Sequence, residues 1–185
     1  TTQIFFKTKK RKYVFIDAPG HKEFIRNMIT GASSADIAVL IIDAYEGLKE
    51  QTKKHAYLLK LLGLDNVICL FNKIDKINYD EKKFLKVEKD LLQFTHEIGI
   101  KVTATIPVSA KYGENIVKKS KKLNWYNGQP FCETLDSHNT KKGTDDLPLR
   151  LPIQDIYKID DKRVIVGRIE TGELKLNDEL FFLPS

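Results

Sequence analysis

Short apolar strand-like runs alternate with amphipathic helix-like segments over residues 1–145 of the chain. The runs Ile37–Ile42 and Val67–Phe71 are uniformly apolar, which predicts strands that are covered on both faces. Farther along, apolar residues recur at helical spacing and end at a glycine suited to a left-handed helix terminus; they are Phe84, Val87, Leu91, Phe94, Ile98 and Gly99. The alternation predicts an α/β fold with a mainly parallel sheet and right-handed crossovers.

Other segments fit the same alternation. Ile4–Phe6 and Tyr13–Ile16 are predicted strands joined by a basic turn. His21–Thr30 and Glu50–Leu62 are predicted helices, because each has helical character and is followed by a glycine. Lys101–Val108 is predicted to be a further strand of the sheet.

The pattern changes near residue 140, where the polar stretch Ser137–Asp146 predicts a linker. Beyond it, Leu147–Ile153 alternates apolar and other residues with a period of two, and Val164–Ile169 and Leu180–Leu183 also resemble strands. We therefore expect residues 146–185 to form the first strands of a small β-barrel domain. About 40 residues are too few to close a barrel, so both predicted domains, 1–145 and 146–185, are expected to be incomplete.

Composition excludes several classes of protein. The longest uncharged apolar run, Ile37–Ile42, is far too short to span a membrane. Cys69 and Cys132 sit in apolar runs and are predicted to be core residues in a reducing, cytoplasmic compartment. The net charge is +6, but only five of the 31 basic residues are arginines. Because dedicated phosphate and base readers rely on the arginine fork, the charge alone does not indicate a nucleic-acid partner, and DNA is not expected.

Two basic clusters have simple structural interpretations. Lys7–Lys12 is flanked by strand-like runs, which favours a hairpin tip. Lys118–Lys122 precedes a Trp-Tyr stretch, Trp125–Gly128. An interaction loop is conceivable there, although the pattern favours a solvated helix face.

The stretch Asp17-Ala18-Pro19-Gly20-His21 follows the predicted strand YVFI directly. Ligands of open α/β sheets bind at the carboxyl ends of strands. An aspartate there can hold Mg²⁺ through water, and the backbone N–H of Gly20 can meet a terminal phosphate without a Cβ in the way. An ordinary Pro-Gly turn is the alternative interpretation.

Two more stretches follow predicted strands. Asp75 can accept hydrogen bonds from N1–H and the 2-amino group of guanine, a donor pair that adenine lacks. Asn72 can serve the N7 edge of the base, and the Lys73 stem can cover one of its faces. In the weaker stretch Ser109-Ala110-Lys111, the Ala110 N–H can donate to guanine O6 and Ser109 can brace the Asp75 loop. Taken in order, the three stretches favour guanine-nucleotide binding.

These stretches carry a family resemblance. DAPGHKEFIRNM, NKID and SAK resemble the third, fourth and fifth GTPase motifs of the translation-factor superfamily, and LPIQDIYKI…RVIVGRIETGELKLNDEL resembles the start of its β-barrel domain. Within the superfamily, the segments ITGASSADIAVLIIDAYEGLKEQTKKHAYLLKLLG and NWYNGQPFCETL are judged most similar to the GTPase subunit of bacterial sulfate adenylyltransferase. A translation elongation or termination factor is the alternative.

The resemblance implies a P-loop GTPase-type sheet, with GTP or GDP and Mg²⁺ as cofactors. It implies Asp17 as an outer-shell Mg²⁺ residue, Gly20 as the γ-phosphate sensor and His21 as the residue that orients the hydrolytic water. The guanine-binding set it implies is Asn72, Lys73, Asp75, Ser109, Ala110 and Lys111. The expected partner is the catalytic subunit of ATP-sulfate adenylyltransferase, or, in the alternative, aminoacyl-tRNA and the ribosome.

One departure from the family pattern is large. P-loop GTPases hold the phosphates with G-x-x-x-x-G-K-[ST], and none of the ten glycines here is followed by lysine. We therefore expect a piece of a longer GTPase that lacks the phosphate loop and is inactive alone. The strand that carries this loop lies between the strands ending at Asp17 and Ile42 in the family, so these two strands are expected not to pair directly.

Overall fold

The computed structural model describes residues 2–17, 35–64, 66–138 and 146–183. The chain divides into two compact units, Thr1–His138 and Asn139–Ser185. Unit 1 contains β1 (Thr2–Lys7), β2 (Lys12–Asp17), β3 (Ala38–Asp43), α2 (Glu50–Leu61), β4 (Asn66–Asn72), the 3₁₀ turn η2 (Ile74–Ile77), α3 (Glu81–Glu97), β5 (Lys101–Pro107) and α4 (Phe131–Ser137). Unit 2 contains β6 (Ile153–Ile159) and β7 (Lys162–Gly167).

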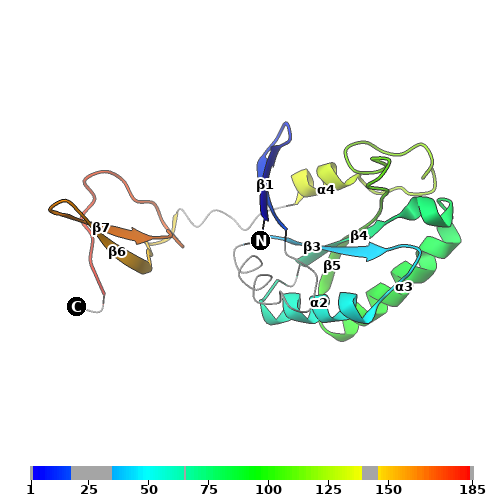
Figure 1. The fold of residues 1–185 in the computed structure, drawn as a ribbon, viewed down its shortest axis with the longest axis horizontal. Helices are drawn as coiled ribbons and strands as arrows, with labels where there is room; N and C mark the ends of the chain where they lie inside the picture. The colour runs from blue at the N-terminus through cyan, green and yellow to red at the C-terminus, as the bar shows by residue number, and fades with distance from the viewer. Residues whose placement is uncertain (1, 18–34, 65, 139–145, 184–185) are drawn as a thin grey trace. The chain divides into compact units, whose positions relative to one another are not determined.

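The centre of unit 1 is a parallel sheet in the order β3-β4-β5, which confirms the predicted α/β class. Helices α2 and α3 lie on one side of this sheet and α4 lies on the other (Figure 1). The β3–β4 register sets Asp43 opposite Asn72 at the carboxyl ends of the two strands. Polar residues that follow β3, β4 and β5 are therefore delivered to one edge of the sheet.

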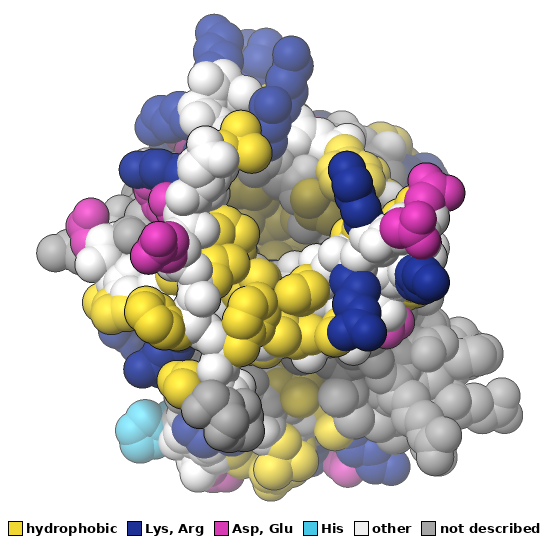
Figure 2. Space-filling model, turned by 90° about the vertical axis from the view of Figure 1, so that its left-hand side faces the viewer, with side chains coloured by type: hydrophobic (Ala, Val, Ile, Leu, Met, Phe, Trp, Pro, Cys, Tyr) yellow, Lys and Arg dark blue, Asp and Glu magenta, His cyan; other side chains and the backbone are white. Residues whose placement is uncertain are grey.

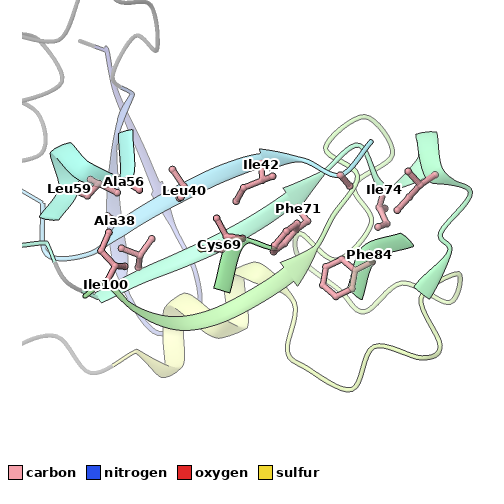
Figure 3. Close-up of a cluster of buried hydrophobic side chains, with 14 of the residues drawn as sticks. Ala38, Leu40, Ile42, Ala56, Leu59, Cys69, Phe71, Ile74, Phe84 and Ile100 are labelled. Atoms are coloured by element: carbon pink, nitrogen blue, oxygen red, sulfur yellow. The ribbon is translucent and has the colours of Figure 1, made fainter. Parts of the chain in front are cut away.

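One face of the sheet packs under α2 and α3. Alternate residues of the strands point to this face, as the strand period of two requires, and they meet apolar residues of the helices (Figure 3). Phe71 from β4 and Phe84 from α3 are in edge-to-face contact, with ring centroids 5.1 Å apart. The fully buried members of this cluster include Ile42, Ala56, Cys69, Phe71, Ile74 and Leu91.

The opposite face is covered by α4 and by the β1–β2 hairpin. Ile68 and Leu70 of β4 join Phe131 and Leu135 of α4 in a second buried cluster, against which hairpin aromatics such as Phe15 pack. Phe15 stacks on Phe131 at 5.9 Å. Because both faces of β4 are buried over Val67–Phe71, this part of the strand has to be apolar throughout, and VICLF meets that requirement.

The hairpin is the one predicted for the basic turn, with β1 and β2 antiparallel. Its tip is anchored to α4, since Thr8 Oγ1 and Tyr13 Oη each donate to Asp136 Oδ1 at 2.7 Å. Among the described strands, β2 pairs with β1 alone and β3 with β4 alone. The predicted lack of direct pairing between Tyr13–Ile16 and Ile37–Ile42 is therefore confirmed.

Both predicted helices that lie within the described residues are present. In α3, the Asp80 side chain caps the amino terminus by accepting from the Lys83 N–H at 2.9 Å. Gly99 follows this helix with φ +72°, the left-handed conformation expected there. The predicted helix His21–Thr30 lies outside the described residues.

Unit 2 corrects two predictions. Leu147–Ile153 is not a strand: Pro148 and Pro152 lack the N–H that a ladder needs, and only Arg150 forms an isolated bridge, to Thr171. The strand β6 begins only at Ile153, and it pairs with β7 to form an antiparallel hairpin. Leu180–Leu183 is also not a strand, because no described strand pairs with it.

Apolar side chains remain exposed on unit 2. Leu176, Phe181 and Leu183 are 95%, 94% and 87% exposed. Figure 2 shows hydrophobic side chains gathered on one face of the molecule. A single hairpin cannot bury such side chains by itself.

Two remaining expectations concern the compartment. Among the described residues, no helix has both the length and the apolar character needed to cross a bilayer. Cys69 and Cys132 are free thiols, and burial raises the pKa of Cys69 to about 12. Cys69 is thus the core residue that its apolar run predicts.

Candidate guanine-binding site

The carboxyl end of β4 carries three of the predicted base-binding residues. Asn72 is the last residue of the strand, Lys73 follows with a left-handed φ of 63°, and Asp75 lies in the 3₁₀ turn η2. The left-handed residue reverses the chain abruptly, so Asp75 is brought back beside the sheet edge. The buried Ile74 and Ile77 hold this turn on the core.

The loop after β5 meets this turn directly. Ser109 is fully buried, and its Oγ donates to Asp75 Oδ1 at 2.6 Å. The expectation that Ser109 braces the Asp75 loop is therefore confirmed. One carboxylate oxygen of Asp75 is held by this bond, which leaves the other available as an acceptor.

Asn72 joins the same two loops through its side-chain oxygen. Asn72 Oδ1 accepts from the Lys73 N–H at 2.8 Å and from the Ala110 N–H at 3.0 Å. Because both partners are donors, they identify this end of the amide as the oxygen and turn the NH₂ away from them. The Ala110 N–H is predicted to donate to guanine O6, but in this structure it donates to Asn72. To bond guanine O6, this N–H must either share its hydrogen bond with Asn72 or leave Asn72.

Asp43 was not predicted from the sequence. It ends β3, and its carboxylate binds Lys73 Nζ at 2.5 Å while accepting from the N–H groups of Tyr45 and Glu46. Partial burial by itself would raise the pKa of Asp43, but these hydrogen bonds outweigh it and lower that pKa. The same ion pair raises the pKa of Lys73. The pairing depends on the β3–β4 register, which only the folded sheet supplies.

A buried asparagine shapes the second loop. Asn115 Nδ2 donates to the Pro107 carbonyl at 3.0 Å, and its Oδ1 accepts from the Ser120 N–H at 2.8 Å. Ser109 and Glu114 exchange two main-chain hydrogen bonds, of 3.2 and 3.1 Å, and so close the loop that carries Ala110. In the sequence, Asn115 looks like an ordinary polar loop residue, and no pattern distinguishes it.

The predicted phosphate-side residues are separate from this group. Asp17 is the last residue of β2 and is exposed, and within the described residues no hydrogen bond or ion pair joins it to the base-binding set. Gly20 and His21 lie outside the described residues. The described ranges hold no group of three or more His, Cys, Asp or Glu side chains suited to a metal ion.

The donor and acceptor set fits a guanine ring. Asp75 supplies a carboxylate acceptor, Asn72 an amide NH₂, and the loop that carries Ala110 a main-chain donor beside them. Lys73 and Lys111 are exposed at the two loops, where their apolar stems can flank a planar base. Asn72 and Asp75 therefore lie with Ser109 and Ala110 in one hydrogen-bonded polar cluster at this edge of the sheet.

A parallel sheet with polar loops at neighbouring carboxyl ends defines the class of α/β nucleotide-binding domains. Residues 1–142 match the family described as the Elongation factor Tu GTP binding domain. The chain belongs to this family, whose GTPases bind GTP or GDP with Mg²⁺.

The chain is also similar to curated proteins and solved structures. It is 46% identical over 181 residues to Elongation factor 1-alpha of Thermococcus kodakarensis and 47% identical to that of Pyrococcus abyssi, in each case covering 97% of this chain and 42% of the relative. The sup35 structure complexed with GDP aligns with a TM-score of 0.62 at 28% identity, over 95% of this chain and 44% of the other. Bacterial selenocysteine-specific elongation factor EF-Sec aligns with a TM-score of 0.62 at 26% identity, over 94% and 28%.

These similarities bear on the functional expectations. They confirm the translation-factor resemblance and the GTPase-type fold. They do not support the more specific similarity to the sulfate adenylyltransferase subunit, because these relatives are translation elongation factors. The chain spans less than half the length of these relatives.

Proposed function

We propose that this chain is the base-recognition part of the GTP-binding domain of a translation elongation GTPase. The observation that carries the proposal is the hydrogen-bonded junction of two loops, in which Ser109 binds Asp75 and the Ala110 N–H binds Asn72. These loops follow neighbouring parallel strands, so the Asp75 carboxylate and the Asn72 amide lie at one edge of the sheet. The family match and the relatives named above support this choice over sulfate activation.

In this proposal, Asp75 accepts from guanine N1–H and the 2-amino group, and the Asn72 NH₂ donates to N7. The Ser109 hydroxyl keeps Asp75 oriented, because its short hydrogen bond leaves the carboxylate little freedom to rotate. Asp43 holds Lys73 by its ammonium group, so the lysine stem is placed before the base arrives. In this proposal Asp75 and Lys73 are held in place before the base binds, whereas the Ala110 N–H has to share or leave its bond to Asn72 Oδ1.

Exchange of Asp75 for asparagine tests base recognition. Asp75→Asn in the full-length protein should shift preference from GTP toward xanthosine triphosphate, because xanthine carries an acceptor where guanine carries the 2-amino donor. We expect the ratio of GTP to xanthosine triphosphate affinity to fall by at least about 100-fold, because a site built to hydrogen-bond a ligand N–H strongly rejects a ligand that lacks it. Retention of the wild-type ratio would show that Asp75 does not read the base.

The phosphate-side roles are proposed on the family resemblance alone: Asp17 binds Mg²⁺ through water, the Gly20 N–H senses the γ-phosphate, and His21 orients the attacking water. His21→Ala in the full-length protein should slow GTP hydrolysis by about 10²- to 10⁴-fold with nearly unchanged GTP affinity. Single-turnover hydrolysis and equilibrium binding separate the two effects. Equal losses in both would indicate a structural role for His21.

The partner is proposed to be aminoacyl-tRNA on the ribosome. Affinity capture of the full-length protein loaded with a non-hydrolysable GTP analogue should recover aminoacyl-tRNA. Recovery of an ATP-sulfate adenylyltransferase instead would contradict this proposal and indicate a role in sulfate activation. The GDP-loaded protein serves as the control, since a GTP-dependent carrier releases its cargo in that state.

A further inference from the structure

A group of interacting side chains lies just outside the two proposed base-binding loops. Lys122 Nζ forms an ion pair with Glu114 at 3.1 Å and a hydrogen bond with the Tyr79 hydroxyl at 3.4 Å. The same ammonium group lies 5.0 Å from the ring centroid of Tyr79 and 5.5 Å from that of Tyr112. One lysine therefore contacts three side chains from two separate loops.

Each of these loops leads directly to a base-binding residue. Tyr79 follows η2 and closes it by donating its N–H to the Ile74 carbonyl at 3.1 Å, next to Asp75. Glu114 pairs its main chain with Ser109 through two hydrogen bonds. Lys122 thus connects the end of the Asp75 turn to the end of the Ser109–Ala110 loop.

The Tyr79 segment needs such support. Asn78 and Tyr79 have φ values of 56° and 57°, two consecutive left-handed residues that are not glycine. This conformation is unfavourable and persists only where neighbours enforce it. The segment around Lys122 supplies two restraints, because Trp125 Nε1 also donates to the Tyr79 carbonyl at 2.9 Å.

The segment that carries this lysine is not the solvated helix face favoured by the sequence pattern. It forms successive turns, with Ser120 fixed by buried Asn115 and with the Lys122 N–H donating to Ser120 Oγ at 3.1 Å. The Lys122 side chain is 54% exposed and that of Glu114 only 18%. Hydrogen bonds from Ser120 and Lys122 lower the pKa of Glu114, so the carboxylate is ionised at neutral pH.

We infer that Lys122 is a positioning residue for guanine specificity, which holds the Asp75 turn and the Ala110 loop at the separation that a guanine edge requires. The inference rests on the proposed function, because it assumes that these loops read the base. Lys122 itself contacts neither Asp75 nor Ala110 within the described structure. Its effect is transmitted through Tyr79 and Glu114.

The test compares GDP with inosine diphosphate, which lacks only the 2-amino group. In the full-length protein, Lys122→Met should lower the ratio of GDP affinity to inosine diphosphate affinity by about two- to fivefold, the range expected for one partly exposed ion pair. Lys122→Arg should restore the ratio, because a guanidinium can still pair with Glu114 and lie over the tyrosine rings. The affinities are measured by titration with fluorescent nucleotide analogues.

Lys121→Met is the matched control. Lys121 is adjacent and exposed, and it makes no hydrogen bond or ion pair within the described ranges, so its loss should leave the ratio unchanged. A merely structural weakening by Lys122→Met would reduce the affinity for both nucleotides equally. That result, or equal ratios in the Lys121 and Lys122 variants, would overturn the inference.

Glu114→Gln gives a second measurement. If the two residues act as a pair, the double variant should have the same nucleotide ratio as either single variant, whereas independent effects would add. Additive effects would contradict the inferred connection. Failure of the proposed function is distinguishable, since the wild-type protein would then lack selectivity for GDP over both inosine and adenosine diphosphates.

Discussion

Single side chains at the base-binding junction perform two tasks at once. Asn72 uses its oxygen to hold the Lys73 and Ala110 amides and leaves its NH₂ for a ligand. Asp75 uses one oxygen for Ser109 and keeps the other as an acceptor. Substitutions at Asn72 can separate the two tasks, which are support of the loops by the oxygen and the proposed recognition of the base by the NH₂.

Asn72→Ala removes the acceptor for both amides, and we expect it to lower the free energy of unfolding by about 1 kcal/mol, the net value of a typical hydrogen bond. Asn72→Asp retains an acceptor at the same place but has no NH₂ to donate to N7. It should therefore keep most of the stability and lose guanine affinity, whereas Asn72→Ala should lose both. Urea unfolding and nucleotide titration of the two variants check this, and equal stability of both would contradict the supporting role of the oxygen.

At the scale of elements, the β1–β2 hairpin is attached to α4 mainly through Asp136. Its carboxylate accepts from Thr8 and Tyr13, and the Arg11 guanidinium donates to the His138 carbonyl at 2.7 Å. Burial and then the hydrogen bond to Asp136 raise the pKa of Tyr13 from 10.0 to about 12. The protonated phenol is therefore the form that the docked hairpin favours.

This linkage predicts how stability depends on alkaline pH. A raised pKa means that the stabilisation is complete below the unfolded value of about 10 and is lost as the pH rises through the folded value of about 12. Tyr13→Phe should cost about 1 kcal/mol at pH 8 through the lost hydrogen bond. Between pH 10 and 12, the free energy of unfolding should fall less in this variant than in the wild type, because the variant has no phenol to ionise. Urea unfolding at pH 8, 10 and 11 tests this, and parallel curves would refute the assignment to Tyr13.

For the whole of unit 1, both faces of the central strand β4 are buried, and the loops that follow the strands rest on the two clusters that cover it. Leu91 of α3 is fully buried among the residues beneath the sheet, whereas Leu85 of the same helix is 47% exposed. These two leucines differ in environment and share the same helix. They therefore form a matched pair for measuring how much the core contributes.

Leu91→Ala should lower the free energy of unfolding by about 2 to 5 kcal/mol, because it leaves a cavity in a packed core. Leu85→Ala, at a partly exposed position, should cost less than about 1 kcal/mol. Denaturant midpoints with unchanged m-values give the comparison. Similar costs at the two sites would mean that α3 does not pack as described.

Local patterns in the sequence predicted the strands of unit 1 and the helices α2 and α3, but not the short helix α4. Apolar runs such as Val67–Phe71 can be read because a strand with two buried faces must be apolar throughout. Periodicity alone gives the wrong answer at Leu147–Ile153, because Pro148 and Pro152 have no N–H for a strand ladder despite the period-two alternation. The helix pattern at Lys118–Lys122 is also misleading, because the turns there are fixed by the hydrogen bond from the Ser120 N–H to buried Asn115.

The sequence by itself determined the α/β class, the strand-end positions of Asn72, Asp75 and Ser109, and the family, since these depend on local periodicity and short motifs. Only the tertiary structure decided that Asp43 pairs with Lys73 and that Lys122 lies between Tyr79 and Glu114. These partners are 30, 43 and 8 residues apart in the chain. Their meeting is decided by strand register and loop closure, which no local pattern encodes.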